Sequence, residues 1–138
     1  MKRKDPICKY NYAMLLDDSE LDNFINQKTI EATNFANKIY INTGSKSALE
    51  FLNNLEISSN DKIDIFPEII FIDINMPMID GFQFIENFKK TFSSRFINTK
   101  IVILTSSISQ NDRIKADKIS KGIIFLNKPL TKDALDQI

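Results

Sequence analysis

Several apolar runs of this chain end in polar side chains that can do chemistry. They are three carboxylates, one hydroxyl and one ammonium, from Asp17, Asp18, Asp73, Thr105 and Lys128. Carboxylates that lie close together repel one another unless a cation lies among them. Oxygen ligands suit Mg²⁺, which binds few carboxylates and leaves room for phosphate oxygens. If these side chains meet at one place, they predict a Mg²⁺-dependent site for phosphoryl transfer.

Asp73 is the predicted nucleophile of this set. A carboxylate at the end of an apolar strand is unfavourable unless a cation or hydrogen bonds compensate it. A carboxylate can accept a phosphoryl group, and it needs no general base because it is ionised at neutral pH. A metal ion and the Lys128 ammonium can neutralise charge on the transferring group. The chain has no histidine, which excludes a histidine base, metal ligand or phosphohistidine of its own.

The sequence also predicts a scaffold that brings strand ends together. Apolar, β-branched runs predict strands at residues 10–16, 38–42, 68–74, 100–104 and 122–126. Helical spacing predicts helices after residue 19, at about 45–55 and 82–88, at 110–120 and from 131 onward. Strands that alternate with helices in this way predict an α/β fold, with a parallel sheet covered on both faces. Ligands of such sheets bind at the carboxyl ends of the strands, where the polar residues stand.

The first helix illustrates a competing interpretation of the Asp17–Asp18 pair. An acidic pair before a helix is commonly a cap that favours the helix dipole, and Ser19 or Asp18 can cap this one. The pair alone therefore does not indicate a metal site. The spacing predicts an amphipathic helix with these apolar positions: Leu21, Phe24, Ile25, Ala32 and Phe35. In the fourth helix, Ile114 and Ile119 are predicted to share one side.

Composition narrows the classes of protein that this chain can represent. The 138 residues fit one domain, with 43% hydrophobic and 26% charged residues. Lys plus Arg and Asp plus Glu both number 18, so the net charge argues against a general nucleic-acid binder. No apolar run is long enough to span a bilayer. The single cysteine, Cys8, excludes an internal disulfide and fits a cytoplasmic location.

Four segments at the predicted strand ends resemble the receiver domains of two-component response regulators. They are Leu15–Ser19 (LLDDS), Ile72–Gly81 (IDINMPMIDG), Ile103–Ser106 (ILTS) and Phe125–Pro129 (FLNKP). Their order and approximate spacing match, and the resemblance runs from about residue 11 to the C-terminus. It implies a doubly wound five-stranded parallel sheet of flavodoxin-like order 2-1-3-4-5, in a stand-alone, chemotaxis-type receiver. We therefore expect an N-terminal extension at residues 1–9 and a receiver at residues 10–138 whose fifth helix is cut short.

The resemblance also implies a role for each acidic residue. Asp73 would take a phosphoryl group from a phosphohistidine on a sensor histidine kinase or histidine phosphotransfer protein. Asp18 and Asp73 would bind Mg²⁺ directly and Asp17 mostly through water, and the backbone carbonyl of Asn75 would be a further ligand. The only reactions catalysed would be the chain's own phosphorylation and dephosphorylation, so an enzyme in the usual sense is not expected.

Further roles concern the response to phosphorylation. Lys128 would hold one phosphoryl oxygen, and the Thr105 hydroxyl would donate a hydrogen bond to another. Thr105 would then move toward the phosphate and let Phe125 turn inward, although Phe125 lacks the hydroxyl of the tyrosine that the family often has. Asn75 and Ser107, each two residues after a site residue, would tune dephosphorylation.

Partners are implied by the same resemblance. An output protein would bind through the fourth helix, fifth strand and fifth helix, and the kinase would dock on the first helix after Asp18. Ten residues follow Lys128, so an effector domain that binds DNA or RNA is not expected in this chain, which is either a stand-alone receiver or a fragment.

Two other classes of function stay open at this point. A phosphohydrolase of the haloacid dehalogenase kind also uses an aspartate at a strand end. It usually has a second aspartate two residues later, where this chain has Asn75, and a cap domain does not fit in 138 residues. The second class is a receiver-like interaction module that works without phosphorylation. The loss of an acidic site residue, of Thr105 or of Lys128 would favour this second class.

Overall fold

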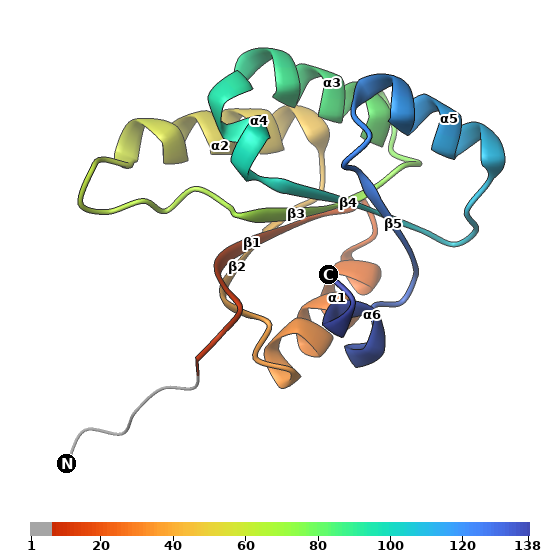
Figure 1. Cartoon of the computed structure of the whole chain (residues 1–138), viewed down its shortest axis with the longest axis horizontal. Helices are drawn as coiled ribbons and strands as arrows, with labels where there is room; N and C mark the ends of the chain where they lie inside the picture. Colours follow the sequence, from red (N-terminus) through yellow and green to blue (C-terminus); the bar gives the residue numbers. More distant parts are fainter. Residues whose placement is uncertain (1–6) are drawn as a thin grey trace.

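Five parallel strands form the centre of the computed structural model, which describes residues 7–138 (Figure 1). The strands are β1 (Tyr10–Leu16), β2 (Ala36–Asn42), β3 (Ile69–Asp73), β4 (Lys100–Thr105) and β5 (Ile124–Asn127). They lie in the order β2-β1-β3-β4-β5, so the winding direction reverses between β1 and β3. The predicted doubly wound sheet of order 2-1-3-4-5 is therefore confirmed. The first six residues of the predicted N-terminal extension lie outside the described residues.

Helices cover both faces of the sheet (Figure 1). On one face lie α1 (Glu20–Ala32) and α6 (Lys132–Asp136). On the other lie α2 (Ser45–Ser58), α3 (Gly81–Thr91), α4 (Ser93–Asn98) and α5 (Gln110–Ile119). The predicted fourth and fifth helices are thus α5 and α6, and the short α4 was not predicted. Among residues 7–138 no helix has the length and apolar character needed to cross a membrane.

Alternation along the strands creates two cores. In β3, Ile70 and Ile72 pack toward α2, α3 and α5, whereas Ile69 and Phe71 pack toward α1 and α6. All four side chains are fully buried. A strand covered on both faces is expected to be apolar throughout, which is why the run before Asp73 contains only large hydrophobic residues. Asp73 ends this strand and is held at a defined position by both cores.

The apolar face predicted for α1 is wrong. Leu21, Phe24 and Ile25 are 66%, 55% and 41% exposed, and the helix instead buries Asn23, Asn26 and Ile30. The asparagines face inward because they satisfy backbone groups of neighbouring segments. The Asn23 side-chain amide donates to the carbonyl of Asp17 at 2.9 Å, and the Asn26 side-chain oxygen accepts from the Leu130 N–H at 2.9 Å.

Smaller differences concern the ends of elements and one helix face. Phe35 lies beyond α1, where it is buried against β1 and β3 rather than on the helix. Ile114 is 47% exposed while Ile119 is 9% exposed, so the two do not share a buried side of α5. The fifth strand begins two residues later than predicted, at Ile124. None of these differences moves the carboxyl ends of the strands.

Candidate functional site

The predicted polar residues lie at neighbouring strand ends. Asp17 and Asp18 directly follow β1, Asp73 closes β3, Thr105 closes β4 and Lys128 directly follows β5. The register pairs Asp73 with Leu104, and the Lys128 N–H donates to the Thr105 carbonyl at 2.9 Å. One carboxylate oxygen from each of the three aspartates lies within 4.8 Å of the others. The topology therefore gathers residues that are up to 111 positions apart, from 17 to 128, at one edge.

Lys128 is the cation of this cluster. Its Nζ lies 2.6 Å from Asp17 Oδ2, 3.1 Å from Asp73 Oδ1 and 3.0 Å from Asp22 Oδ2. Burial disfavours the ammonium, but its interactions with these carboxylates outweigh that effect and raise the pKa of Lys128 above its usual value. Lys128 is therefore charged at any physiological pH. The peptide bond between Lys128 and Pro129 is cis.

Asp73 is buried, with 7% of its surface exposed. Burial and the negative charge of Asp17 raise the pKa of Asp73 above its usual value, and Lys128 opposes that rise. The ionised form of Asp73 is thus destabilised even with Lys128 present. A second cation beside Asp73 would stabilise it.

Asp17 supplies a test of whether a metal ion fits. Its Oδ1 accepts a hydrogen bond from the Ser19 N–H at 2.9 Å. Its Oδ2 is buried and lies 2.6 Å from Lys128 Nζ, yet no hydrogen bond of suitable geometry reaches this oxygen from the described residues. Because Asp17 Oδ2 shares this ammonium with Asp73 and Asp22, the carboxylates outnumber the single cation, and a second cation would balance them better. The donors Asp17, Asp18 and Asp73 are all oxygens, so they fit Mg²⁺ better than a softer metal.

The loop after Asp73 is fixed by backbone contacts. The Gly81 N–H donates to the Ile74 carbonyl at 2.9 Å, and a Cβ built on Gly81 would lie 2.5 Å from the Asp73 carbonyl oxygen. Asp80 caps α3 in a reciprocal pair with Gln83. The absence of a side chain at Gly81 thus lets α3 approach the acceptor strand closely. Asn75, within this loop, is exposed.

Thr105 and Phe125 occupy the adjoining part of the sheet. Thr105 is buried, and its hydroxyl donates to the carbonyl of Ser107 at 3.1 Å. Phe125 is partly buried on the α5 side, and the Arg113 guanidinium lies 5.3 Å from the centre of its ring. Ser107 is exposed. The roles predicted for these residues stay predictions.

Asp22 is the site residue that sequence reasoning missed. It lies in the first turn of α1, where an acidic residue is ordinarily explained by the helix dipole. Its partner Lys128 is 106 positions away, so no local pattern connects them. The one sequence signal was its place four residues after Asp18, in the helix turn that faces the same strand ends.

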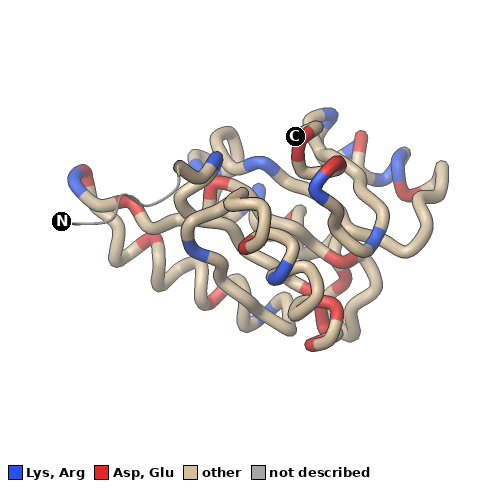
Figure 2. Tube along the Cα trace, turned by 90° about the horizontal axis from the view of Figure 1, so that it is seen from below, with Lys and Arg blue, Asp and Glu red and all other residues tan. Residues whose placement is uncertain are grey.

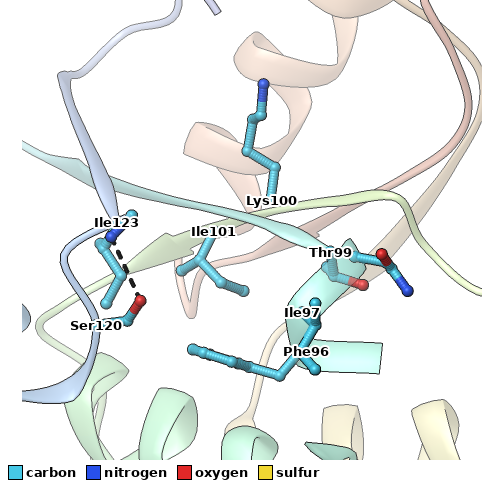
Figure 3. Close-up of a pocket in the computed structure, with 9 residues that line it drawn as sticks. Phe96, Ile97, Thr99, Lys100, Ile101, Ser120 and Ile123 are labelled. Atoms are coloured by element: carbon cyan, nitrogen blue, oxygen red, sulfur yellow. Dashed lines mark hydrogen bonds between the residues drawn. The ribbon is translucent and has the colours of Figure 1, made fainter. Parts of the chain in front are cut away.

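Two hollows bear on where a ligand would bind. A cavity of about 420 Å³ is lined by residues that include Phe96, Thr99 and Ile123 (Figure 3). It lies at the amino-terminal start of β4, has no carboxylate in its lining, and so is at the wrong end of the sheet for the predicted chemistry. A smaller hollow of about 210 Å³ adjoins the cluster and is lined by Asp22, Ile25, Asn26, Ser106, Lys128 and Pro129. We call it the lysine hollow.

Fold and site together define a class of protein. The sheet is flavodoxin-like, and its switch point gathers three carboxylates beside a partly buried lysine. The chain matches the model of the response regulator receiver domain over residues 13–138. It therefore belongs to this family, the receiver domains of two-component systems.

Individual relatives agree with this assignment. A two-component response regulator from Cytophaga hutchinsonii is 33% identical, with a TM-score of 0.81 over 92% of each chain. The sensor histidine kinase CheAY of Helicobacter pylori is 27% identical over 91% of this chain and 14% of its own length. Protein PilG of Pseudomonas aeruginosa is 36% identical over 52% of this chain and 51% of its own length. The chain thus spans about half, or less, of these two curated relatives.

A more distant structure supports the fold alone. The receiver domain of the histidine kinase CKI1 from Arabidopsis thaliana, complexed with Mg²⁺ and BeF₃⁻, is 18% identical to this chain. Its TM-score is 0.74, over 93% of this chain and 91% of that one.

Proposed function

We propose that this chain is a phosphoacceptor that takes a phosphoryl group from a partner phosphohistidine onto Asp73. The observation that carries the proposal is the cluster at the switch point. Three aspartate oxygens lie within 4.8 Å of one another, and one lysine ammonium contacts both Asp17 and Asp73. Asp18 adds a third carboxylate to the cluster, and its exposure makes it accessible to an ion from solvent.

The proposed reaction is a displacement at phosphorus. A carboxylate oxygen of Asp73 forms the new O–P bond while the P–N bond of the phosphohistidine breaks, and the imidazole leaves with the electron pair. Lys128, already 3.1 Å from Asp73 Oδ1, stabilises negative charge on the phosphoryl oxygens. Mg²⁺ would be held by Asp17, Asp18, Asp73 and the backbone carbonyl of Asn75, and when bound it supplies positive charge opposite the phosphoryl oxygens.

The response would begin at Thr105 and Phe125. The Thr105 hydroxyl now donates to Ser107, and it would exchange this partner for a phosphoryl oxygen. Phe125 is only partly buried, so it can repack against α5 when Thr105 moves. The output surface would be α5, β5 and α6, and Asn75 and Ser107 would tune the lifetime of the phosphoryl group.

The exposed apolar face of α1 is a suitable place for the phosphodonor protein to dock. Ile25 lines the lysine hollow, and Leu21 and Phe24 of the same helix also leave their apolar surface in contact with solvent. A sensor kinase or phosphotransfer protein of the cytoplasm would cover this face. Positive and negative residues are interspersed in the view of Figure 2, and we assign no nucleic-acid or membrane partner to this chain.

Intact-mass spectrometry after incubation with acetyl phosphate and Mg²⁺ tests the function. The wild-type chain should gain one phosphoryl group that persists, and Asp73→Asn, which keeps the shape of the side chain, should gain none. Steady release of phosphate from simple esters would instead support the hydrolase. A chain that gains nothing would support the phosphorylation-independent interaction module.

Calorimetry tests the metal separately. The wild-type chain should bind Mg²⁺ without phosphate, because the aspartates of the cluster carry more negative charge than the Lys128 ammonium can balance. Asp18→Ala should bind it at least tenfold more weakly, since it removes a proposed ligand. Asp61→Ala, an exposed aspartate on the connection between α2 and β3, is the control and should bind as the wild type does. Equal affinity in all three proteins would contradict the proposed metal site.

A further inference from the structure

The Lys128 ammonium is shared by carboxylates of different kinds. Asp17 and Asp73 belong to strand ends, and their side chains are 5% and 9% exposed. Asp22 belongs to α1, and its side chain is 36% exposed. The contact with Asp22, at 3.0 Å, has hydrogen-bond geometry, whereas the shorter contact with Asp17 Oδ2 does not. The lysine is thus directed toward the helix as well as toward the acceptor.

We infer that Asp22 is a positioning residue that competes with the phosphoryl group for the Lys128 ammonium. This role rests on the proposed function, and it adds a residue that the predicted site did not contain. Before phosphorylation Asp22 would hold Lys128 on the α1 side of the cluster. After phosphorylation Lys128 would exchange Asp22 for a phosphoryl oxygen.

Exposure makes Asp22 the partner that Lys128 can leave. Water can solvate the Asp22 carboxylate once the ammonium moves, because more than a third of that side chain is already exposed. Asp17 is almost completely buried, and a carboxylate left unpaired there would be strongly unfavourable. The three contacts of Lys128 therefore differ in strength, and the Asp22 contact is the one that an incoming anion can replace.

The position of Asp22 is fixed by the turn that also fixes Asp17. The Asp22 N–H donates to Ser19 Oγ at 3.2 Å, which makes Ser19 the cap of α1. The next residue, Asn23, is buried and donates to the carbonyl of Asp17 at 2.9 Å. The start of α1 is thus tied to the end of β1, and Asp22 faces Lys128 as a consequence.

The lysine hollow determines how the charge of Asp22 acts on an ion that approaches Lys128. Asp22 and Lys128 both line it, so its negative and positive walls face the same space of about 210 Å³. The Asp22 charge repels an anionic phosphodonor that approaches the ammonium and attracts a cation to the cluster. Asp22 would therefore favour Mg²⁺ binding and oppose the binding of a small phosphodonor. These two effects have opposite signs, which separates a positioning role from simple damage to the fold.

The test compares Asp22→Asn with Glu20→Gln. Glu20 lies in the same turn of α1, is exposed, and has no ion pair among the described residues, so it controls for the loss of one charge. In Asp22→Asn, calorimetry should show a dissociation constant for Mg²⁺ that is about three- to tenfold higher. At saturating Mg²⁺, the acetyl phosphate concentration for half-maximal phosphorylation should fall about three- to tenfold. Glu20→Gln should change neither value more than twofold, and Asp22→Glu should restore both toward wild type.

Three results would overturn the inference. Asp22→Asn could behave as Glu20→Gln does in both measurements, or it could weaken Mg²⁺ and acetyl phosphate together, which would indicate a structural role. In both cases a normally phosphorylated wild type would leave the proposed function standing. A wild type that takes no phosphoryl group from acetyl phosphate would overturn the proposed function and this role together.

Discussion

Gly81 shows how one missing side chain positions the acceptor aspartate. A Cβ at this position would meet the Asp73 carbonyl oxygen at 2.5 Å and the Ile74 Cα at 2.9 Å. Both are backbone atoms of the segment that carries the acceptor, so neither can rotate away. Contacts this short force a shift of the strand end or of α3.

We predict that Gly81→Ala lowers the free energy of unfolding by about 1–3 kcal/mol and slows phosphorylation by acetyl phosphate. Gly122→Ala is the matched control, because its Cβ would meet Ser120 Oγ at an ordinary 3.8 Å. It should change stability by less than about 0.5 kcal/mol. Urea denaturation of both variants measures the difference. Similar stability in the two variants would show that the strand end can adjust to the added methyl group.

At the residue scale, the sequence predicted the site residues that a local pattern and the strand topology together identify. Asp73 and Thr105 were found because each ends an apolar run, and parallel strands bring such ends together. Asp22 was not found, because its contact with Lys128 depends on the rotation of α1 about its own axis. That rotation is set by hydrogen bonds to distant backbone groups, which a pattern of apolar residues does not record.

At the element scale, α1 packs on the sheet with two buried amides, Asn23 and Asn26, beside the apolar Ile30. Asn26 accepts from the N–H of Leu130, which follows Pro129 on the loop after β5. This bond ties α1 to the loop that carries Lys128. Its loss would leave a buried N–H without a partner, which is more unfavourable than a lost surface contact.

We predict that Asn26→Leu lowers the free energy of unfolding by about 1–3 kcal/mol even though it adds apolar surface to a buried position. Phe24→Ser should change it by less than about 0.5 kcal/mol, because Phe24 is 55% exposed and the two residues have similar helix propensities. Thermal or urea denaturation provides the measurement. The reverse order of stabilities would mean that α1 packs with the face that its apolar spacing first predicted.

The helix α4 shows a second limit of sequence patterns. It has six residues, buries none of them, and directly follows α3 with Phe92 between the two helices. A segment this short does not show enough of an apolar periodicity to distinguish a helix from a turn. Its function in the fold is carried by Arg95, which lies 2.7 Å from both Glu56 Oε2 and Asp64 Oδ2. These contacts join α4 to the end of α2 and to the connection before β3.

At the scale of the whole molecule, polar networks secure the two ends of the sheet differently. At the carboxyl edge, four carboxylates surround or adjoin one ammonium, and that imbalance suits a site that must accept a cation and a phosphoryl group. At the amino edge, Arg95 contacts two carboxylates, those of Glu56 and Asp64. The sequence predicted the first network through its strand ends. It could not predict the second, because the connection between α2 and β3 has no periodic pattern.

Tyr40 joins β2 to the connection between α2 and β3, and it makes the stability of the fold depend on pH. Its hydroxyl donates to the Ile65 carbonyl at 2.7 Å, and its ring stacks on Tyr12 with centres 5.7 Å apart. Burial, the neighbouring Tyr12 and the charge of Asp64 raise the pKa of Tyr40 from 10.0 to about 12. The folded chain therefore keeps the phenol neutral where the unfolded chain ionises it.

The sign of the effect follows from linkage. A pKa that is higher in the folded state stabilises the fold fully below pH 10, and this contribution is lost as the pH rises toward 12. We predict that the stability difference between the wild type and Tyr40→Phe is constant below pH 10 and shrinks between pH 10 and 12. Urea denaturation across this range measures it, and Tyr10→Phe, which leaves Tyr40 in place, should keep the wild-type dependence. A difference that stays constant up to pH 12 would mean that Tyr40 ionises as readily in the folded chain as in the unfolded one, so that its contact with Ile65 does not tie β2 to the connection in solution.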